Sequence, residues 1–187
     1  TPCGTLFPYT TLFRSDDLPR FDLPEGYSMR RHRDGDRETW VRVQQASEPY
    51  DEITSETYDR GFGGDETGLR RRQFFLVAPD GRDVGTISAW YDRGYRGRRW
   101  GMIHYVAIQP EHRGKGLCRS IMTVAMERMR SLGHRRARLT TQNPRYAAIR
   151  TYLRFGFAPD MTYKEARRAW SIIGRSIDHP AIRAALR

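Results

Sequence analysis

The chain has 187 residues, of which 38% are hydrophobic and 29% are charged, and this composition is typical of one globular domain. No apolar run approaches the roughly 20 residues that span a bilayer, no basic segment precedes an apolar stretch near the start, and the only cysteines are Cys3 and Cys118. These features predict a cytoplasmic protein without a membrane span, a disulfide framework or a metal site.

The net charge of +11 raises the question of a nucleic-acid partner. The basic residues are almost all arginines, because Lys115 and Lys164 are the only lysines, and they are spread along the chain. This bias is typical of GC-rich coding rather than of a selected binding patch. We therefore expect no nucleic acid as the main partner.

The first residues need separate treatment. The stretch over 5–15, TLFPYTTLFRS, resembles the in-frame translation of a common sequencing adapter; an aromatic-rich natural leader is the alternative. We expect residues 1–15 to have no place in the fold. Residues 1–26 together are predicted to be an extended, non-native segment.

The next part of the chain alternates in the way expected of strands, with two helical stretches. The predicted elements are a strand over 27–33, a helix from Asp34 or Asp36 to Ser47, a short helix within 48–72, a hairpin of Gln73–Ala78 and Val84–Tyr91 around a Pro-Asp-Gly turn, and a strand over Trp100–Ile108.

Helical spacing dominates the second half. The predicted elements are a helix from Gly116 to Gly133, a strand over Ala137–Thr141, a helix capped by Asn143 that stops at Gly156, and a helix over 162–178. No strand is evident over 158–163. This order predicts an α/β fold with a mixed sheet and a parallel crossover, with a main domain over 27–160 and a C-terminal helical extension over 161–187.

The stretch Val106–Leu117 carries the clearest chemistry. A buried strand ends, a short loop follows, and a helix begins. Gly114 and Gly116 let the backbone approach a ligand closely, and the free N–H groups at a helix start suit a phosphate. Arg113 and Lys115 add positive charge. The stretch predicts a pyrophosphate cradle, with a tight strand-to-helix turn as the alternative.

This loop and the helix after it together resemble the GCN5-related N-acetyltransferase (GNAT) superfamily. The family pattern of Gln or Arg, two residues, Gly, one residue, then Gly or Ala fits residues 111–116, with Glu111 in the first position. The resemblance covers about residues 28–157. A second family signature is matched by Asn143, Ala147, Tyr152 and Gly156-Phe157.

The resemblance implies a central mixed sheet that is splayed between its two parallel central strands, flanked by helices, with an extra C-terminal helix. It implies transfer of an acetyl group from acetyl-CoA to a primary amine of a small molecule or protein by direct attack. Pantetheine would bond to the backbone of Val106 and Ile108. The cofactor-binding residues that it implies are Val106, Ala107, Ile108, Arg113, Gly114, Lys115, Gly116, Leu117 and Asn143.

The resemblance also suggests two catalytic residues. Tyr152 would act as general acid toward the departing thiolate, with a buried core tyrosine as the alternative. Histone acetyltransferases of the family carry a Glu at the position of Met102, and His104 shares that strand face. His104 matches a histidine proposed as base in arylalkylamine acetyltransferases; a hydrogen-bonded strand histidine and a water relay remain alternatives. His112 is expected to face solvent.

The acceptor is not identified by the sequence. Residues 48–64 and 90–97 are expected to form its pocket, with aromatic walls that include Tyr58, Phe62 and Trp90 and with carboxylates such as Asp51. Transfer from another acyl-CoA, a non-catalytic acyl-CoA-binding sensor and a basic RNA-associated module are the alternatives. A homodimer is left open.

Overall fold

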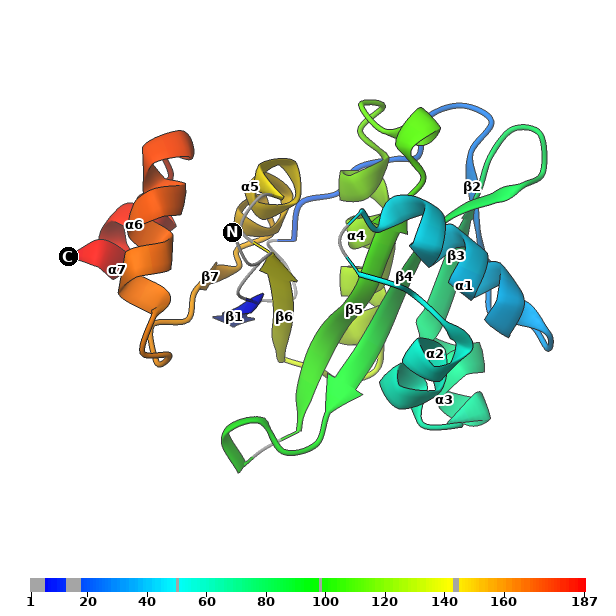
Figure 1. Ribbon diagram of the computed structural model, residues 1–187, viewed down its shortest axis with the longest axis horizontal. Helices are drawn as coiled ribbons and strands as arrows, with labels where there is room; N and C mark the ends of the chain where they lie inside the picture. Colours follow the sequence, from blue (N-terminus) through cyan, green and yellow to red (C-terminus); the bar gives the residue numbers. More distant parts are fainter. Residues whose placement is uncertain (1–5, 13–17, 50, 98, 143–144) are drawn as a thin grey trace.

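A single mixed β-sheet organises the molecule in the computed structural model, which describes residues 6–12, 18–49, 51–97, 99–142 and 145–187 (Figure 1). The sheet order is β2-β3-β4-β5-β6-β1-β7. The strands are β1 (Leu6–Leu12), β2 (Ser28–Arg31), β3 (Gln73–Val77), β4 (Asp83–Asp92), β5 (Trp100–Ile108), β6 (Arg136–Gln142) and β7 (Ala158–Pro159). The helices are α1 (Asp36–Ser47), α2 (Ser55–Phe62), α3 (Glu66–Arg72), α4 (Leu117–Ser131), α5 (Tyr146–Arg154), α6 (Ala166–Ser176) and α7 (Pro180–Leu186).

The two central strands diverge. Strands β2 to β5 form an antiparallel ladder, whereas β5 and β6 run parallel. Among the described residues, β5 and β6 pair only near their starts, at Gly101 with Ala137 and at Met102 with Arg138. The strands therefore separate toward their carboxyl ends. This confirms the predicted α/β class with its splayed parallel pair.

Two hydrophobic clusters cover the two faces of the sheet. Phe74 and Leu76 of β3 point into the cluster built with α4, while the intervening Phe75 packs with Trp40 of α1. This alternation is the two-residue period of a strand. In Figure 1, α1, α2 and α3 lie in front of the sheet and α4 lies behind it.

The front cluster corrects the expected acceptor pocket. Tyr58, Phe62 and Trp90 were expected to form walls of a pocket, but each is 5% exposed or less. The Phe62 ring contacts both neighbours, tilted against Tyr58 and edge to face with Trp90. Aromatic side chains stabilise the fold more when they are buried in this core than when they are exposed on a loop.

Most predicted elements are present, with small differences. The stretch over 48–72 holds two helices, α2 and α3, rather than one, because Gly63 and Gly64 adopt a positive φ and end α2. A two-residue strand, β7, occupies part of 158–163. The predicted C-terminal helix stops at Ser176, and α7 follows it. Among the described residues, no helix is both long and apolar enough to cross a membrane.

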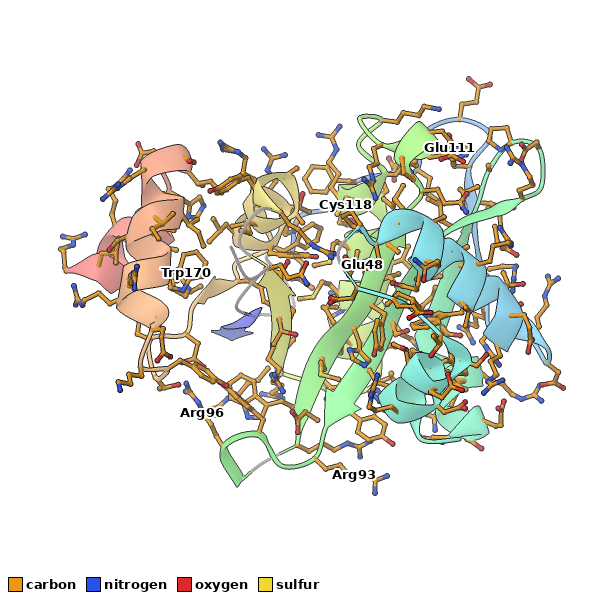
Figure 2. All side chains as sticks on the ribbon, in the orientation of Figure 1. Glu48, Arg93, Arg96, Glu111, Cys118 and Trp170 are labelled. Atoms are coloured by element: carbon orange, nitrogen blue, oxygen red, sulfur yellow. The ribbon has the colours of Figure 1, made fainter. Side chains whose placement is uncertain are left out.

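The C-terminal helices share the main core. Trp170 and Ile173 of α6 and Ile182 of α7 are buried and belong to the cluster that α4 forms with the sheet. Figure 2 shows Trp170 between α6 and the rest of the molecule. The division of the chain into 1–26, 27–160 and 161–187 stays a prediction.

The expectation that residues 1–15 have no place in the fold is wrong for residues 6–12. Strand β1 lies between β6 and β7 and pairs antiparallel with β6 from Leu6 opposite Gln142 to Leu12 opposite Arg136. The segment is rich in Thr and aromatic residues, which favour strands, and the divergent β6 offers an edge to pair with. The adapter origin of the segment stays a prediction.

Candidate active site

A β-bulge shapes β5 at the point where the strands diverge. Ser88 and Thr86 of β4 lie opposite His104 and Ala107 of β5, so β5 holds one extra residue. Tyr105 takes up the irregularity with a φ of 48°, a conformation that costs free energy in a non-glycine residue. Its carbonyl accepts a hydrogen bond from the Thr86 hydroxyl at 3.1 Å. The bulge turns the end of β5 away from β6.

A cavity of about 470 Å³ lies in the space that this divergence opens. Its walls come from the end of α1, from β5, from the loop before α4, and from α5. Gln44 forms part of the wall and donates hydrogen bonds to the Thr86 hydroxyl at 2.6 Å and to the Tyr105 carbonyl at 3.0 Å. The same residues that hold the bulge therefore also hold the cavity wall.

The predicted cradle residues lie along this cavity. Val106, Ala107, Ile108, Gly114, Gly116 and Leu117 all line it, together with Arg113. Gly116 has a φ of 78° and stands directly before the first turn of α4, so the free N–H groups of that turn begin here. A Cβ atom added at Gly114 would have no atom within 4 Å, which leaves open space for a ligand beside the loop.

The two basic residues of the loop differ. The Arg113 guanidinium donates to the carbonyls of Ile108 and Ser47, both at 2.9 Å, and so bridges β5 and α1. Lys115 is exposed, does not line the cavity, and has its Nζ 3.2 Å from the Tyr27 hydroxyl. Of the two, Arg113 is the one placed to meet a bound phosphate.

His112 was expected to face solvent, and this expectation is wrong. Its side chain is buried, with Nδ1 2.8 Å from the Tyr27 hydroxyl. Its Nε2 is buried and has no hydrogen-bond partner among the described residues, and the ring lines the cavity. A buried polar atom without a partner is costly. A ligand group in the cavity would supply that partner, so the site fits an oxyanion such as a pyrophosphate.

The structure also favours a different register for the loop pattern. If the family pattern is placed two residues later, it begins at Arg113 and has Gly116 as its first glycine. Cys118 then stands where the pattern has Gly or Ala. Arg113, Gly116 and Cys118 all line the cavity, whereas Glu111 does not. Figure 2 shows Glu111 at the outer end of the loop.

A polar network crosses the cavity mouth between α1 and α5. The Arg145 guanidinium forms an ion pair with Glu48 and donates to Gln142 Oε1 at 2.9 Å. Gln142 Nε2 in turn donates to Asp51 at 3.1 Å. Asn143, predicted to bind pantetheine, lies outside the described residues. The sequence pattern gave no signal for Glu48 or Arg145 as a pair, because they are far apart in the chain.

Tyr152 is buried but reaches the cavity from α5. Its side chain is 5% exposed and lines the cavity close to Cys118 and Arg145. Burial raises the pKa of its hydroxyl well above the usual range, and Cys118 adds to this, while Arg145 acts in the opposite direction. The hydroxyl therefore keeps its proton at neutral pH, as a proton donor must.

His104 does not line this cavity. Its ring packs against Tyr105 and Phe62, with centroids 4.1 Å and 5.7 Å away. Burial lowers its pKa to about 4; a backbone hydrogen bond with Gly61 opposes that effect, and Arg138 adds to it. His104 is therefore neutral at physiological pH, and it lies on the same side of the sheet as α2.

Comparison with known proteins identifies the family. The model of the acetyltransferase (GNAT) family matches residues 31–157, well over half of the chain. The chain belongs to the GNAT family. This confirms the predicted resemblance to that family.

Curated GNAT relatives are distant. The chain is 29% identical over 167 residues to mycothiol acetyltransferase of Geodermatophilus obscurus, covering 81% of this chain and 52% of that protein. It is 27% identical over 149 residues to mycothiol acetyltransferase of Streptomyces coelicolor, covering 78% of this chain and 47% of that protein. The chain thus spans about half the length of these relatives.

Solved structures share the GNAT fold. A GCN5-related N-acetyltransferase from Sphaerobacter thermophilus superposes with a TM-score of 0.67 at 19% identity, covering 86% of this chain and 50% of that one. A NatC complex bound to Gag peptide and CoA gives a TM-score of 0.55 at 18% identity, covering 68% of this chain and 81% of that one. At these identities the likeness concerns the fold alone.

Proposed function

We propose that this GNAT chain transfers an acetyl group from acetyl-CoA to a primary amine by direct attack. The observation that carries the proposal is the single cavity that joins the end of β5, the glycine loop and Tyr152. These parts come from three separate stretches of sequence, and a thioester transferase needs all three beside one another.

The chain's own groups suit acetyl-CoA. Over Val106–Ile108 the described part of β6 does not pair with β5, so this edge of the strand is open to pantetheine, which would share the Ile108 carbonyl with the Arg113 guanidinium. The N–H groups at the start of α4, Arg113 and the Nε2 of His112 would bind the pyrophosphate. Asn143 keeps its proposed role on the pantetheine arm through the family resemblance.

Tyr152 would protonate the departing thiolate. Its hydroxyl holds its proton because burial raises the pKa, so a donor is present throughout the neutral pH range. Transfer to the sulfur would leave a phenolate, which the nearby Arg145 stabilises. A free thiol and a reprotonated tyrosine would complete the cycle.

Removal of the proton from the amine has two candidates. His104 is neutral but does not line the cavity, so it would accept the proton through a bridging water, and its low pKa makes it a weak base. Glu48 is the second candidate because its carboxylate lines the cavity, where it would also attract an ammonium group. The matched variants described in the Discussion separate the two.

Thiol release tests the proposal. Acetyl-CoA should raise the melting temperature, CoA should do so nearly as well, and NAD and RNA should not. Release of free thiol from acetyl-CoA should then depend on an added amine, and the names of the relatives make acceptors related to mycothiol the first to include.

Other outcomes would point elsewhere. CoA protection without thiol release for any amine would favour an acyl-CoA sensor, and protection by RNA alone would favour an RNA-associated module. A larger rate with a longer acyl chain would favour another acyl-CoA as donor.

A further inference from the structure

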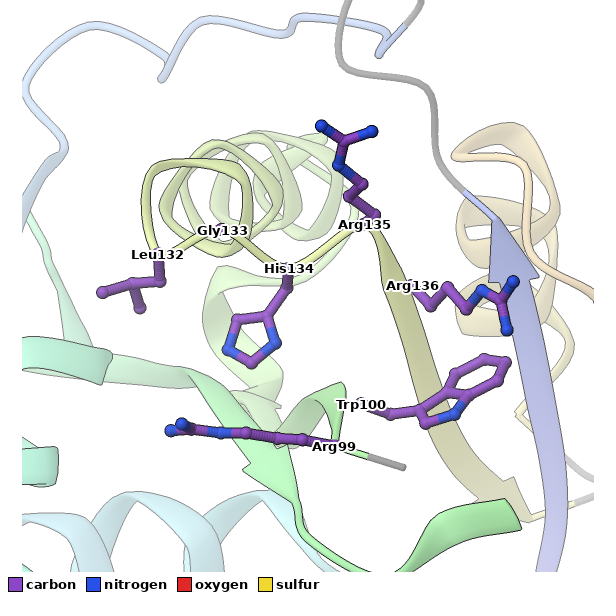
Figure 3. A pocket seen from close by; sticks show the side chains of 7 residues that line it. All are labelled: Arg99, Trp100, Leu132, Gly133, His134, Arg135 and Arg136. Atoms are coloured by element: carbon purple, nitrogen blue, oxygen red, sulfur yellow. The ribbon is translucent and has the colours of Figure 1, made fainter. Parts of the chain in front are cut away.

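A second pocket, of about 450 Å³, lies at the opposite end of β5 from the bulge. It is built by the starts of β5 and β6 and by the turn that follows α4, and the lining residues with polar side chains are Arg99, Trp100, His134, Arg135 and Arg136. Figure 3 shows the His134 ring facing the extended Arg99 side chain, while Arg136 extends to the other side beside Trp100 and Arg135 points away.

This pocket is separate from the acetyl-CoA cavity. Trp100 and Val106 are six residues apart on one strand, which corresponds to roughly 20 Å at about 3.3 Å per residue. The two pockets share no lining residue. A ligand in the second pocket would therefore leave the glycine loop accessible.

The guanidinium groups of the pocket contact aromatic rings rather than carboxylates. The Arg99 guanidinium lies 4.7 Å from the Tyr91 ring centroid, and that of Arg136 lies 5.7 Å from the Trp100 ring centroid. No Asp or Glu lines the pocket, and within the described ranges neither arginine forms an ion pair with a carboxylate. Both guanidinium groups keep their donors available.

A buried arginine stands behind the lining. Arg72 is 7% exposed, and its Nη1 donates to the Ala89 carbonyl at 3.0 Å and lies 3.2 Å from His134 Nε2. Because guanidinium is only a donor, His134 Nε2 accepts and the ring proton resides on Nδ1. Burial lowers the pKa of Arg72, and repulsion from Arg99 and Arg71 lowers it further. Arg72 forms no ion pair within the described ranges, although it lies close enough to the Asp65 carboxyl to lower the pKa of that group. A buried cation without a directly paired carboxylate is costly.

One further donor in the pocket is unsatisfied. Trp100 is 6% exposed, and its Nε1 is buried without a hydrogen-bond partner in the part of the chain that the structure describes. Buried indole N–H groups usually find an acceptor. The pocket therefore combines positive charge with an N–H donor that lacks a partner, and none of its lining residues is a carboxylate.

We propose that this pocket binds a phosphate group, either as free inorganic phosphate or as the monoester of a small molecule. A tetrahedral dianion would accept from the Arg99 guanidinium, which is suited to bidentate contact, with the Trp100 indole as a further donor. The Arg136 guanidinium, which extends to the other side of the pocket, would add positive charge to the site. It would also offset the charge of Arg72 behind the lining.

Titration of phosphate at constant ionic strength tests the site. Inorganic phosphate and glycerol phosphate are added in separate arms to the full chain saturated with CoA, so that the glycine loop is occupied. A phosphate concentration about 100-fold above Kd should raise the melting temperature by about 5–10 °C relative to sodium chloride. Protection by both compounds indicates a site for the phosphate group, and protection by glycerol phosphate alone indicates a monoester site.

Matched variants locate the binding. Arg99→Gln combined with Arg136→Gln should remove most of the protection, while Arg168→Gln combined with Arg175→Gln, on α6, should keep it. Without phosphate, the first double variant should melt close to the temperature of the unaltered protein, because the loss of both ring contacts opposes the relief of repulsion between Arg99 and Arg72. Trp100→Phe should weaken binding about tenfold and keep the fold.

Two results would overturn the proposal. Absence of protection by either compound would show that the pocket holds no phosphate. Equal protection of the unaltered protein and of the Arg99→Gln, Arg136→Gln variant would place the phosphate elsewhere on the protein.

Discussion

Valine at position 116 should weaken CoA binding strongly while costing only a moderate amount of stability. Gly116 has a φ of 78°, where a side chain costs about 1–2 kcal/mol, and an added Cβ atom would lie 2.9 Å from the flexible end of Arg119. For a chain of this size the strain should lower the melting temperature by about 2–8 °C. Loss of one hydrogen bond to a charged phosphate is worth about 1.5–3 kcal/mol, so affinity should fall by about 10- to 150-fold.

The matched control is Gly81→Val. Gly81 has a φ of 83° in the turn between β3 and β4, and an added Cβ atom would meet nothing within 4 Å. This variant should lose similar stability and bind CoA as the unaltered protein does. Calorimetric titration of CoA and thermal melts measure both properties. If Gly116→Val keeps its CoA affinity within a factor of two, the phosphate does not lie against this loop and the reasoning is wrong.

Three further variants address the chemistry. Tyr152→Phe should lower turnover by about 10²–10⁴ and leave acetyl-CoA affinity within about twofold, as measured by thiol release and titration; unchanged turnover would make Tyr152 a packing residue. His104 has a pKa of about 4 in the folded protein, against about 6.5 in the unfolded chain. As the pH falls from 6.5 to 4, the unfolded chain binds a proton that the folded protein does not, so the free energy of unfolding decreases. Urea melts of His104→Gln should therefore show a weaker pH dependence in this range. If His104 is the base, the same variant should also remove an acid limb of kcat/KM near pH 4. Glu48→Gln should raise the KM for the amine about tenfold, because it removes the carboxylate that pairs with Arg145 and would attract the ammonium group. A larger loss of kcat than in His104→Gln would identify Glu48 as the base.

The sequence was sufficient for elements with strong local patterns. The bounds of β5 follow directly from its run of apolar residues, and α4 begins after Gly116 because the glycine loop and the helical spacing agree. The cradle residues from Val106 to Leu117 could be predicted for the same reason: they are contiguous in the chain, so their chemistry does not depend on long-range packing. Of the cofactor-binding residues predicted in this stretch, Lys115 alone does not line the cavity.

Features that depend on contacts between distant segments were not predictable from the sequence. The burial of His112 depends on Tyr27, which is 85 residues away, and a loop histidine carries no local sign of such a partner. Tyr58 and Phe62 have the composition of a binding wall, but Trp40 on α1 covers them.

The sequence by itself determined that the chain is a GNAT protein with a basic glycine loop before α4, because glycines, charges and helix start are local properties. The tertiary structure alone decided what surrounds that loop. The bulge at Tyr105 opens the sheet, and the cavity that results brings Glu48 and Arg145 together although 97 residues separate them. It also decided the place of β1, since pairing between strands depends on which edge is left open and not on the residues of one strand.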